Sequence, residues 1–136
     1  MDSIILRDTR DFPLVQLVHL YRDNEWSSAE KPERLQRALA HSHTVISAWD
    51  GERLVGLGNA ISDGYLVVYY PHLLVLRQYH RQGIGTRIMQ RLQAKYAGLH
   101  QQVLLGDHEA VTFYQRCGFR RAGRTEPMWI YDGNDH

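Results

Sequence analysis

A glycine loop between an apolar run and an amphipathic stretch constrains the fold of this chain more than any other feature. The apolar run is Leu73-Leu74-Val75-Leu76, the loop is Arg81-Gln82-Gly83-Ile84-Gly85-Thr86, and Ile84, Ile88 and Leu92 then share one helical face. This order predicts a strand, a loop and a helix. Glycines leave the loop amides open, and the first N–H groups of a helix lack intrahelical acceptors. Together with the helix dipole, these groups predict a phosphate-binding site.

Two common phosphate-binding loops do not fit this segment. A Walker-type loop ends in Gly-Lys-Ser/Thr, and a dinucleotide-binding loop has a third glycine three residues after the second. Here Thr86 and Arg87 follow Gly85, and Ile88 stands where the third glycine would be. A domain for ordinary nucleotides therefore has little support.

Hydrophobic periodicity predicts the other elements. Asp-Gly pairs at 50–51 and 63–64 separate alternating apolar runs, which is typical of hairpins. The expected strands span residues 4–6, 44–49, 52–62, 65–76, 101–105 and 128–131, and the expected helices begin near Pro13, Pro32, Gly83 and Asp107. Strands followed by strand–helix crossovers predict an α/β or α+β sheet with helices on both faces.

Length and composition limit the class of protein. The 136 residues suit one domain, so residues 1–136 are expected to form a single unit. The net charge is +1 with acids and bases interspersed, which predicts no nucleic-acid partner. No apolar run approaches the roughly 18 residues of a membrane span, and the N-terminus is no signal peptide, so we expect a cytoplasmic protein without a membrane partner. The single cysteine, Cys117, excludes an internal disulfide, and the eight histidines lack metal-ligand spacing, so no metal is expected.

Two segments resemble the motifs of the GCN5-related N-acetyltransferases (GNAT). Residues 79–85, Tyr-His-Arg-Gln-Gly-Ile-Gly, resemble motif A, with His80 where the family has Gln or Arg. Residues 107–119 resemble motif B, Asn-x-x-Ala-x-x-Phe-Tyr-x-x-x-Gly-Phe, with Asp107 in place of Asn. The resemblance covers nearly the whole chain. It implies a mixed, mostly antiparallel sheet of about six to seven strands, splayed between its two central strands and flanked by about four helices.

The resemblance implies acetyl-CoA as the co-substrate. Its pyrophosphate would lie on the amides of residues 81–86, and its pantetheine arm would pair with the backbone of Leu73, Leu74 and Val75. Asp107 would also lie near the pantetheine arm. The family makes room for this arm with a bulge between two strands. Pro71, which cannot donate a hydrogen bond, fits such a bulge or a strand that starts later.

Acetyl transfer needs a proton for the departing thiolate and a neutral amine. By resemblance Tyr114 protonates the thiolate, and the reference pKa values of phenol and thiol, roughly 10 and 8.5, suit that role. The alternative is that Phe113 and Tyr114 form an aromatic pair in the core. His72 interrupts an apolar strand beside the expected splay and is the nearest titratable group for taking the amine proton. Its alternative role is structural.

The leading interpretation is an acetyl-CoA-dependent N-acetyltransferase. The acceptor would be a primary amine of a small molecule or a protein, attacking the thioester directly. An alternative is a non-catalytic acyl-CoA-binding module that docks on a partner protein, with Tyr114 dispensable. The strand expected at residues 128–131 could also pair across a homodimer.

Overall fold

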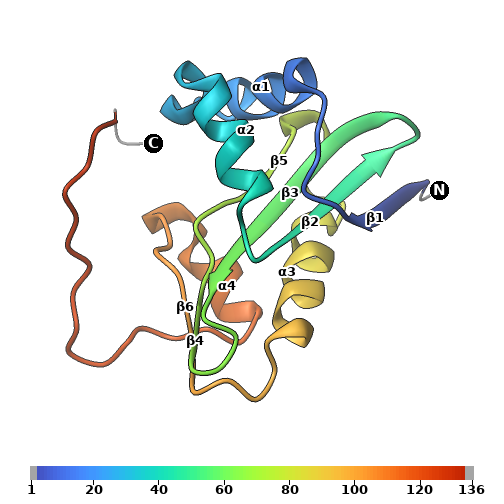
Figure 1. Cartoon of the computed structure of the whole chain (residues 1–136). Helices are drawn as coiled ribbons and strands as arrows, with labels where there is room; N and C mark the ends of the chain where they lie inside the picture. The colour runs from blue at the N-terminus through green and yellow to red at the C-terminus, as the bar shows by residue number, and fades with distance from the viewer. Residues whose placement is uncertain (1–2, 134–136) are drawn as a thin grey trace.

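The structure, a computed structural model, describes residues 3–133. A six-stranded sheet forms its centre, and helices lie against both faces (Figure 1). The strands are β1 (Ile4–Asp8), β2 (Thr44–Asp50), β3 (Arg53–Ser62), β4 (Val67–Tyr69), β5 (Leu73–Val75) and β6 (Gln101–Val103). The α-helices are α1 (Leu14–Asp23), α2 (Pro32–Ala40), α3 (Ile84–Lys95) and α4 (Val111–Arg116), with 3₁₀ turns η1 (Ser27–Glu30), η2 (Arg77–Tyr79) and η3 (His108–Ala110).

The sheet has the order β1-β2-β3-β4-β6, and β5 lies off this path. Both β4 and β5 pair with β3: β4 with residues 61–62 and β5 with residues 56–58. Every pairing is antiparallel except that of β4 with β6, which is parallel. The mixed, mostly antiparallel sheet with four helices was predicted, and this prediction is confirmed. Within residues 3–133, no helix is long and apolar enough to cross a membrane.

The run expected as one strand over 65–76 is broken around Pro71. Tyr69 pairs with Ile61, whereas the carbonyl of His72 accepts a hydrogen bond from the N–H of Asn59. Between these two pairs there are two steps along β3, from residue 59 to 61, and three steps along its partner, from residue 69 to 72. The extra residue is the mark of a β-bulge. Pro71 therefore belongs to a bulge and not to a late strand start.

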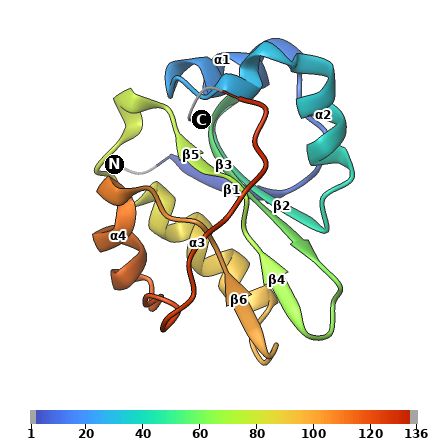
Figure 2. The same cartoon turned by 90° about the vertical axis from the view of Figure 1, so that its left-hand side faces the viewer.

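The bulge splays the sheet. Before it, β4 runs parallel to β6, and the N–H of Tyr70 still donates to the carbonyl of Val103. After it, β5 stays with β3, while residues 104–106 lead away toward α4 (Figure 2). The splay predicted between the two central strands is thereby confirmed.

Two glycines of β3 let α3 approach the sheet closely. A Cβ on Gly58 would lie 3.0 Å from side-chain carbons of both Ile88 and Leu92, and one on Gly56 would lie 3.4 Å from Ile88. Side chains here would push α3 away. The bare face of β3 thus accommodates the helix that follows the glycine loop, and helix packing holds that loop beside β5.

The strand expected at residues 128–131 is absent. Residues 117–133 contain no helix or strand, and Met128 to Tyr131 form an exposed, extended segment. Strand pairing requires an edge that offers backbone partners, and within residues 3–133 the segment pairs with none. The apolar pattern of a segment predicts its β-propensity but not whether a partner strand is available.

Candidate active site

The glycine loop leads into the N-terminus of α3 with open backbone amides. Gly83 has φ +78° and precedes the first helical residue, and the first helical bond runs from the N–H of Arg87 to the carbonyl of Gly83. No side chain caps this helix start, and its first turn holds no acidic residue. Arg81, at φ +63°, adopts a left-handed conformation that costs a non-glycine residue roughly 1–2 kcal/mol. In the predicted phosphate-binding loop, no side chain caps the backbone amides, and two residues, Arg81 and Gly83, have a positive φ.

The two loop glycines differ in their surroundings. A Cβ on Gly83 would meet nothing within 4 Å. A Cβ on Gly85 would lie 3.5 Å from the ring of Phe113 on α4. A side chain at Gly85 would therefore face α4, and Gly83 is the better place to perturb the cradle.

Three hydrogen bonds fix the turn η2 that precedes the loop. Asp23 accepts the N–H of Arg77 at 2.7 Å, and the hydroxyl of Tyr79 donates to Asp50 at 2.6 Å. Nε2 of His80 lies 2.8 Å from the carbonyl oxygen of Val75 and donates to it. The side chain of His80, which departs from motif A, is therefore turned toward β5.

β5 has one backbone edge that faces away from β3. In antiparallel strands, the N–H and carbonyl groups of alternate residues point toward the partner strand. The N–H of Leu76 donates to the carbonyl of Val55, and the N–H of Asn59 donates to the carbonyl of His72. The N–H and carbonyl of Leu74, midway between Leu76 and His72, therefore also point toward β3. The N–H and carbonyl groups of Leu73 and Val75 point to the opposite side, where the sheet splays. Besides His80, the side-chain amide of Asn24 donates to the carbonyl of Val75 at 3.0 Å. Of the three residues expected at the pantetheine arm, Leu73 and Val75 present backbone groups to the splay and Leu74 does not.

His72 lies at the bulge and is held on several sides. Its N–H donates to the side-chain oxygen of Asn59 at 2.9 Å, in addition to the bond at its carbonyl. Its Nδ1 lies 2.7 Å from the hydroxyl of Tyr21, and the rings of Tyr21 and Trp26 pack edge-on against it. Tyr21 is fully buried, and burial raises the pKa of its phenol far above the ordinary value. His72 therefore contacts a hydroxyl that keeps its proton.

Tyr114 is half-buried on α4, beyond the end of β6. Its ring packs edge-on against Phe113 and Phe119, and a Cβ on Gly106 would lie 3.2 Å from it. Burial, with smaller contributions from Asp107 and Cys117, raises the pKa of Tyr114 to about 12. The phenol thus retains its proton throughout the neutral range, as a proton donor must.

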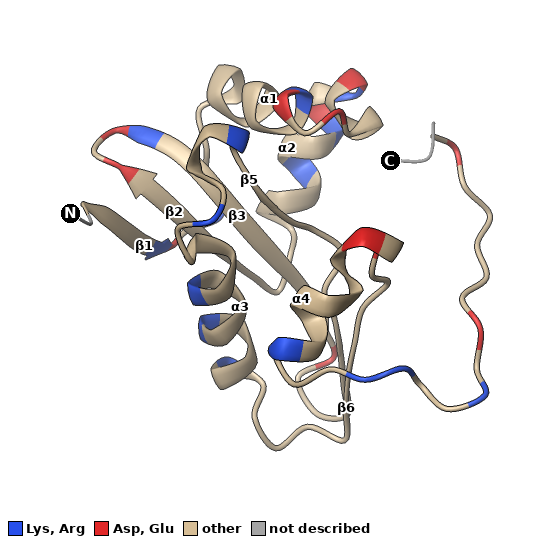
Figure 3. Cartoon of the chain, turned by 180° about the vertical axis from the view of Figure 1, so that it is seen from behind, with Lys and Arg blue, Asp and Glu red and all other residues tan. Residues whose placement is uncertain are grey.

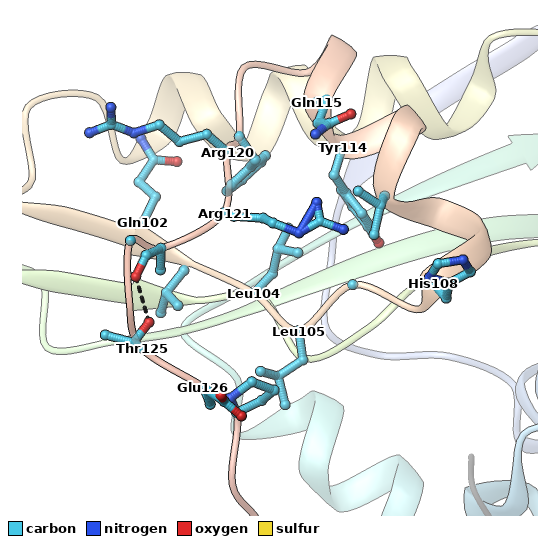
Figure 4. A pocket seen from close by; sticks show the side chains of 17 residues that line it. Gln102, Leu104, Leu105, His108, Tyr114, Gln115, Arg120, Arg121, Thr125 and Glu126 are labelled. Atoms are coloured by element: carbon cyan, nitrogen blue, oxygen red, sulfur yellow. Dashed lines mark hydrogen bonds between the residues drawn. The ribbon is translucent and has the colours of Figure 1, made fainter.

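Tyr114 borders a cavity of about 640 Å³ beside β6 (Figure 4). Residues of β6 and the chain after it line one side, and residues 119–127 line the other. Figure 4 shows the ring of Tyr114 reaching down from α4 toward this space. Tyr114 is therefore not only part of an aromatic pair in the core, because one side of its ring borders a cavity.

Asp107 and Cys117 flank Tyr114 in sequence. Asp107 is exposed and precedes η3, but its side chain makes no capping bond to that turn; its carbonyl accepts the N–H of Ala110 instead. Cys117 is half-buried, and burial raises the pKa of its thiol, which favours the unreactive protonated form.

Basic residues surround the cradle without forming a single basic face. Figure 3 shows Lys and Arg along the outer side of α3 and in the chain before it, with both signs mixed elsewhere. Arg77, Arg81 and Arg87 flank the loop in sequence, but Arg77 forms an ion pair with Glu25 and the guanidinium of Arg87 donates to the carbonyl of Ile4. The backbone amides of the loop are therefore the main attraction for an anion here.

Comparisons with known proteins agree with this geometry. The family profile described as an acetyltransferase (GNAT) domain matches residues 10–128. A GNAT family acetyltransferase from Streptococcus pneumoniae TIGR4 is 31% identical, covers 94% of this chain and 98% of its own, and superposes with a TM-score of 0.81. The chain therefore belongs to the GNAT family, and it is an acyltransferase.

More distant relatives share the fold. The aminoglycoside N-acetyltransferase AAC(6')-Iy, solved with CoA, is 16% identical with a TM-score of 0.69, covering 95% of this chain and 93% of its own. Glucosamine-6-phosphate N-acetyltransferase from Arabidopsis thaliana is 13% identical with a TM-score of 0.69, covering 96% and 99%. No curated protein sequence matches the chain significantly.

The structure adds residues that sequence reasoning did not find. Tyr21, to which the sequence analysis assigned no role, contacts His72, 51 positions away in sequence. Asn24 and His80 meet at the carbonyl of Val75, and Asn59 holds the backbone of His72. No local pattern announces these contacts, because each joins elements that only the folded sheet brings together.

Proposed function

We propose that this chain transfers an acetyl group from acetyl-CoA to a primary amine of a small molecule or protein. The amine attacks the thioester carbonyl directly, without a covalent enzyme intermediate. The observation that carries the proposal is the splay after the bulge. It joins the backbone edge of β5 that faces away from β3, an uncapped amide cradle at α3 and a protonated phenol at Tyr114.

The residues present suit acetyl-CoA in two respects. Its pyrophosphate is an anion that the amides at residues 82–86 and the α3 dipole would stabilise, because no carboxylate competes in the first turn. Its pantetheine amides can pair with a strand edge, which the backbone of Leu73 and the N–H of Val75 offer, while the carbonyl of Val75 is held by Asn24 and His80. Asp107, at the far side of the splay, is proposed to lie along the same arm.

Tyr114 is proposed as the acid for the thiolate. When the C–S bond breaks, the electron pair remains on sulfur, and the phenol proton moves to it. The raised pKa of Tyr114 ensures that the proton is present beforehand. Solvent then returns a proton to the phenolate.

His72 is proposed to take the proton that the attacking amine loses. This role requires the tautomer in which Nδ1–H donates to the Tyr21 hydroxyl and Nε2 holds the lone pair. If the Tyr21 hydroxyl donated instead, the proton of the neutral ring would sit on Nε2, and the ring could not accept another there. The direction of this one bond thus decides whether His72 is a base.

The acceptor site is proposed to lie beside His72 and Trp26. AAC(6')-Iy acts on aminoglycosides and the Arabidopsis relative on glucosamine 6-phosphate, as their names state. Both have an amino sugar as acceptor, so amino sugars belong in the first screen, with polyamines, amino acids and peptides.

The proposal is tested by the release of free CoA thiol from acetyl-CoA in the presence of each amine. We expect release that depends on one class of amine and an acetylated product in equal amount. Binding of acetyl-CoA without any transfer across the screen would instead support a non-catalytic acyl-CoA-binding module.

A further inference from the structure

The bulge at Pro71 has one N–H group that the backbone of neither neighbouring strand accepts. The N–H of Tyr70 donates to the carbonyl of Val103 on β6, and proline has no N–H. The N–H of His72 donates to a side chain instead, the Oδ1 of Asn59, at 2.9 Å. A bulge leaves its extra residue without a ladder partner, and a buried N–H without any partner is costly. Asn59 therefore supplies the acceptor that the strands do not offer.

Asn59 holds both backbone polar groups of His72. Besides accepting the N–H of His72 at its side chain, Asn59 donates its own backbone N–H to the carbonyl of His72 at 3.1 Å. On one side of this point β3 pairs with β4, and on the other side it pairs with β5. Asn59 is thus the residue of β3 that is fastened to the partner chain where the pairing shifts.

A buried serine fixes the direction of the Asn59 amide. Asn59 is 4% exposed, and its Nδ2 donates to the Oγ of Ser42 at 3.1 Å. The hydroxyl of Ser42 in turn donates to the carbonyl of Ala38, in the last turn of α2, at 2.9 Å. Because the hydroxyl has a single proton, its oxygen can only accept from the amide, and it therefore faces Nδ2. This chain of hydrogen bonds runs from α2 to the bulge and leaves Oδ1 facing His72.

The imidazole of His72 has its own attachments, which come from other elements. The hydroxyl of Tyr21 on α1 lies 2.7 Å from Nδ1, and the ring of Trp26 packs edge-on against the imidazole. His72 is thus held at its ring by α1 and the residues after it, and at its backbone by β3. Both attachments decide where the ring stands. A displacement of about 1 Å between reacting groups can lower a rate about a hundredfold.

We propose that Asn59 is a positioning residue: its side chain, fixed by Ser42, holds His72 where the imidazole takes the proton of the attacking amine. This inference rests on the proposed function, because it uses the role of His72 as the base. The Oδ1 and Nδ2 of Asn59 bond to His72 and Ser42, so Asn59 acts on the reaction through His72.

Asn59→Leu is the first test, because leucine keeps the branching at Cγ and has no polar atom. We expect kcat to fall about tenfold to a hundredfold. The affinity for acetyl-CoA should stay within about twofold, because β5 keeps its backbone pairing with β3. Thr44→Val is the matched control: Thr44 is 2% exposed, and its hydroxyl bonds to that of Tyr96 at 2.6 Å, so the variant also loses a buried hydrogen bond. It should keep the parental kcat. An Asn59→Leu variant with a kcat within twofold of the parent, or an equal loss in Thr44→Val, overturns the proposal.

The same substitution in a His72→Asn background tests whether Asn59 acts through the imidazole. With the imidazole gone, Asn59→Leu should lower kcat further by less than about twofold, because the two changes affect one unit. An equal loss in both backgrounds would mean a purely structural role and would overturn the inference. Parental kcat in His72→Asn alone would instead refute the base role of His72, and this inference with it, so failure of the proposed function is recognised separately.

The ¹⁵N signals of the His72 imidazole test the positioning without any activity. A long-range ¹H–¹⁵N spectrum shows which ring nitrogen carries the proton. The parent and Thr44→Val should each show one tautomer, because Nδ1 is held by the Tyr21 hydroxyl. Asn59→Leu should show a mixture of the two. A single tautomer in folded Asn59→Leu overturns the proposal.

Ser42→Ala replaces Asn59→Leu if the latter does not fold. It removes the acceptor of Nδ2 and allows the amide of Asn59 to turn, while Oδ1 remains present. We expect kcat to fall several-fold and the His72 tautomers to mix. Parental kcat together with a single tautomer in Ser42→Ala would overturn the positioning of His72 by this chain of hydrogen bonds.

Discussion

Replacing Gly83 by alanine tests the phosphate cradle at its most exposed glycine. A Cβ there meets nothing within 4 Å, so the variant should fold, but φ +78° is unfavourable for alanine by roughly 1–2 kcal/mol. Loop relaxation that relieves this strain turns the neighbouring amides. Loss of one hydrogen bond to a charged group costs about 1.5–3 kcal/mol, which raises the dissociation constant for acetyl-CoA by roughly 10- to 150-fold.

Gly98→Ala is the matched control for this measurement. Gly98 has φ +92° with nothing within 4 Å of its Cβ, and it lies just beyond the other end of α3, about 18 Å along the twelve-residue helix. Both variants should lower the melting temperature by a similar few degrees. Titration calorimetry should find weaker acetyl-CoA binding only for Gly83→Ala. Equal affinity within twofold for the two variants would refute the cradle.

Three further predictions concern catalysis and packing. Tyr114→Phe should lower kcat about a hundredfold to ten-thousandfold with little change in KM, and a kcat within twofold of the parent would return Tyr114 to a packing role. For the parent, kcat should not fall as the pH is raised to 10, because burial raises the pKa of Tyr114 to about 12 and the phenol keeps its proton. His72→Asn and Tyr21→Phe should each lower kcat; a faster Tyr21→Phe variant would mean that Tyr21 holds the ring of His72 in the wrong tautomer. Gly58→Ala should destabilise the fold by about 1–3 kcal/mol in urea unfolding, because its Cβ lies 3.0 Å from Ile88 and Leu92; unchanged stability would show that α3 can shift freely.

The fold was largely predictable because its signals are local. The Asp-Gly turns place glycines with positive φ at Gly51 and Gly64, and the apolar stripe of α3 buries Ile84, Ile88 and Leu92. The loop and the two motifs lie in continuous sequence, so their geometry follows from a few neighbouring residues. The role of Gly56 and Gly58 could not be predicted from sequence, since a missing side chain can make room for a ligand or for a helix, and only the packing against Ile88 and Leu92 distinguishes the two.

The site was less predictable because its contacts join distant segments. His72 was found by its position before the loop, but its partner Tyr21 looks in sequence like any core residue. The interpretation of residues 128–131 as a strand failed for the same reason. β-propensity describes one chain segment, and a strand also needs an edge to pair with.

The proposed site for acetyl-CoA lies between the cradle and the outward edge of β5. Residue-resolved amide hydrogen exchange, with and without acetyl-CoA, tests this most directly. The N–H groups of Leu73 and Val75 point into the splay, whereas that of Leu74 already faces β3 and serves as the internal control. If acetyl-CoA occupies this site, it slows exchange at Leu73, Val75 and the amides of residues 82–86 and leaves Leu74 unchanged. Unchanged exchange at the cradle and at Leu73 and Val75, with acetyl-CoA bound, would contradict it.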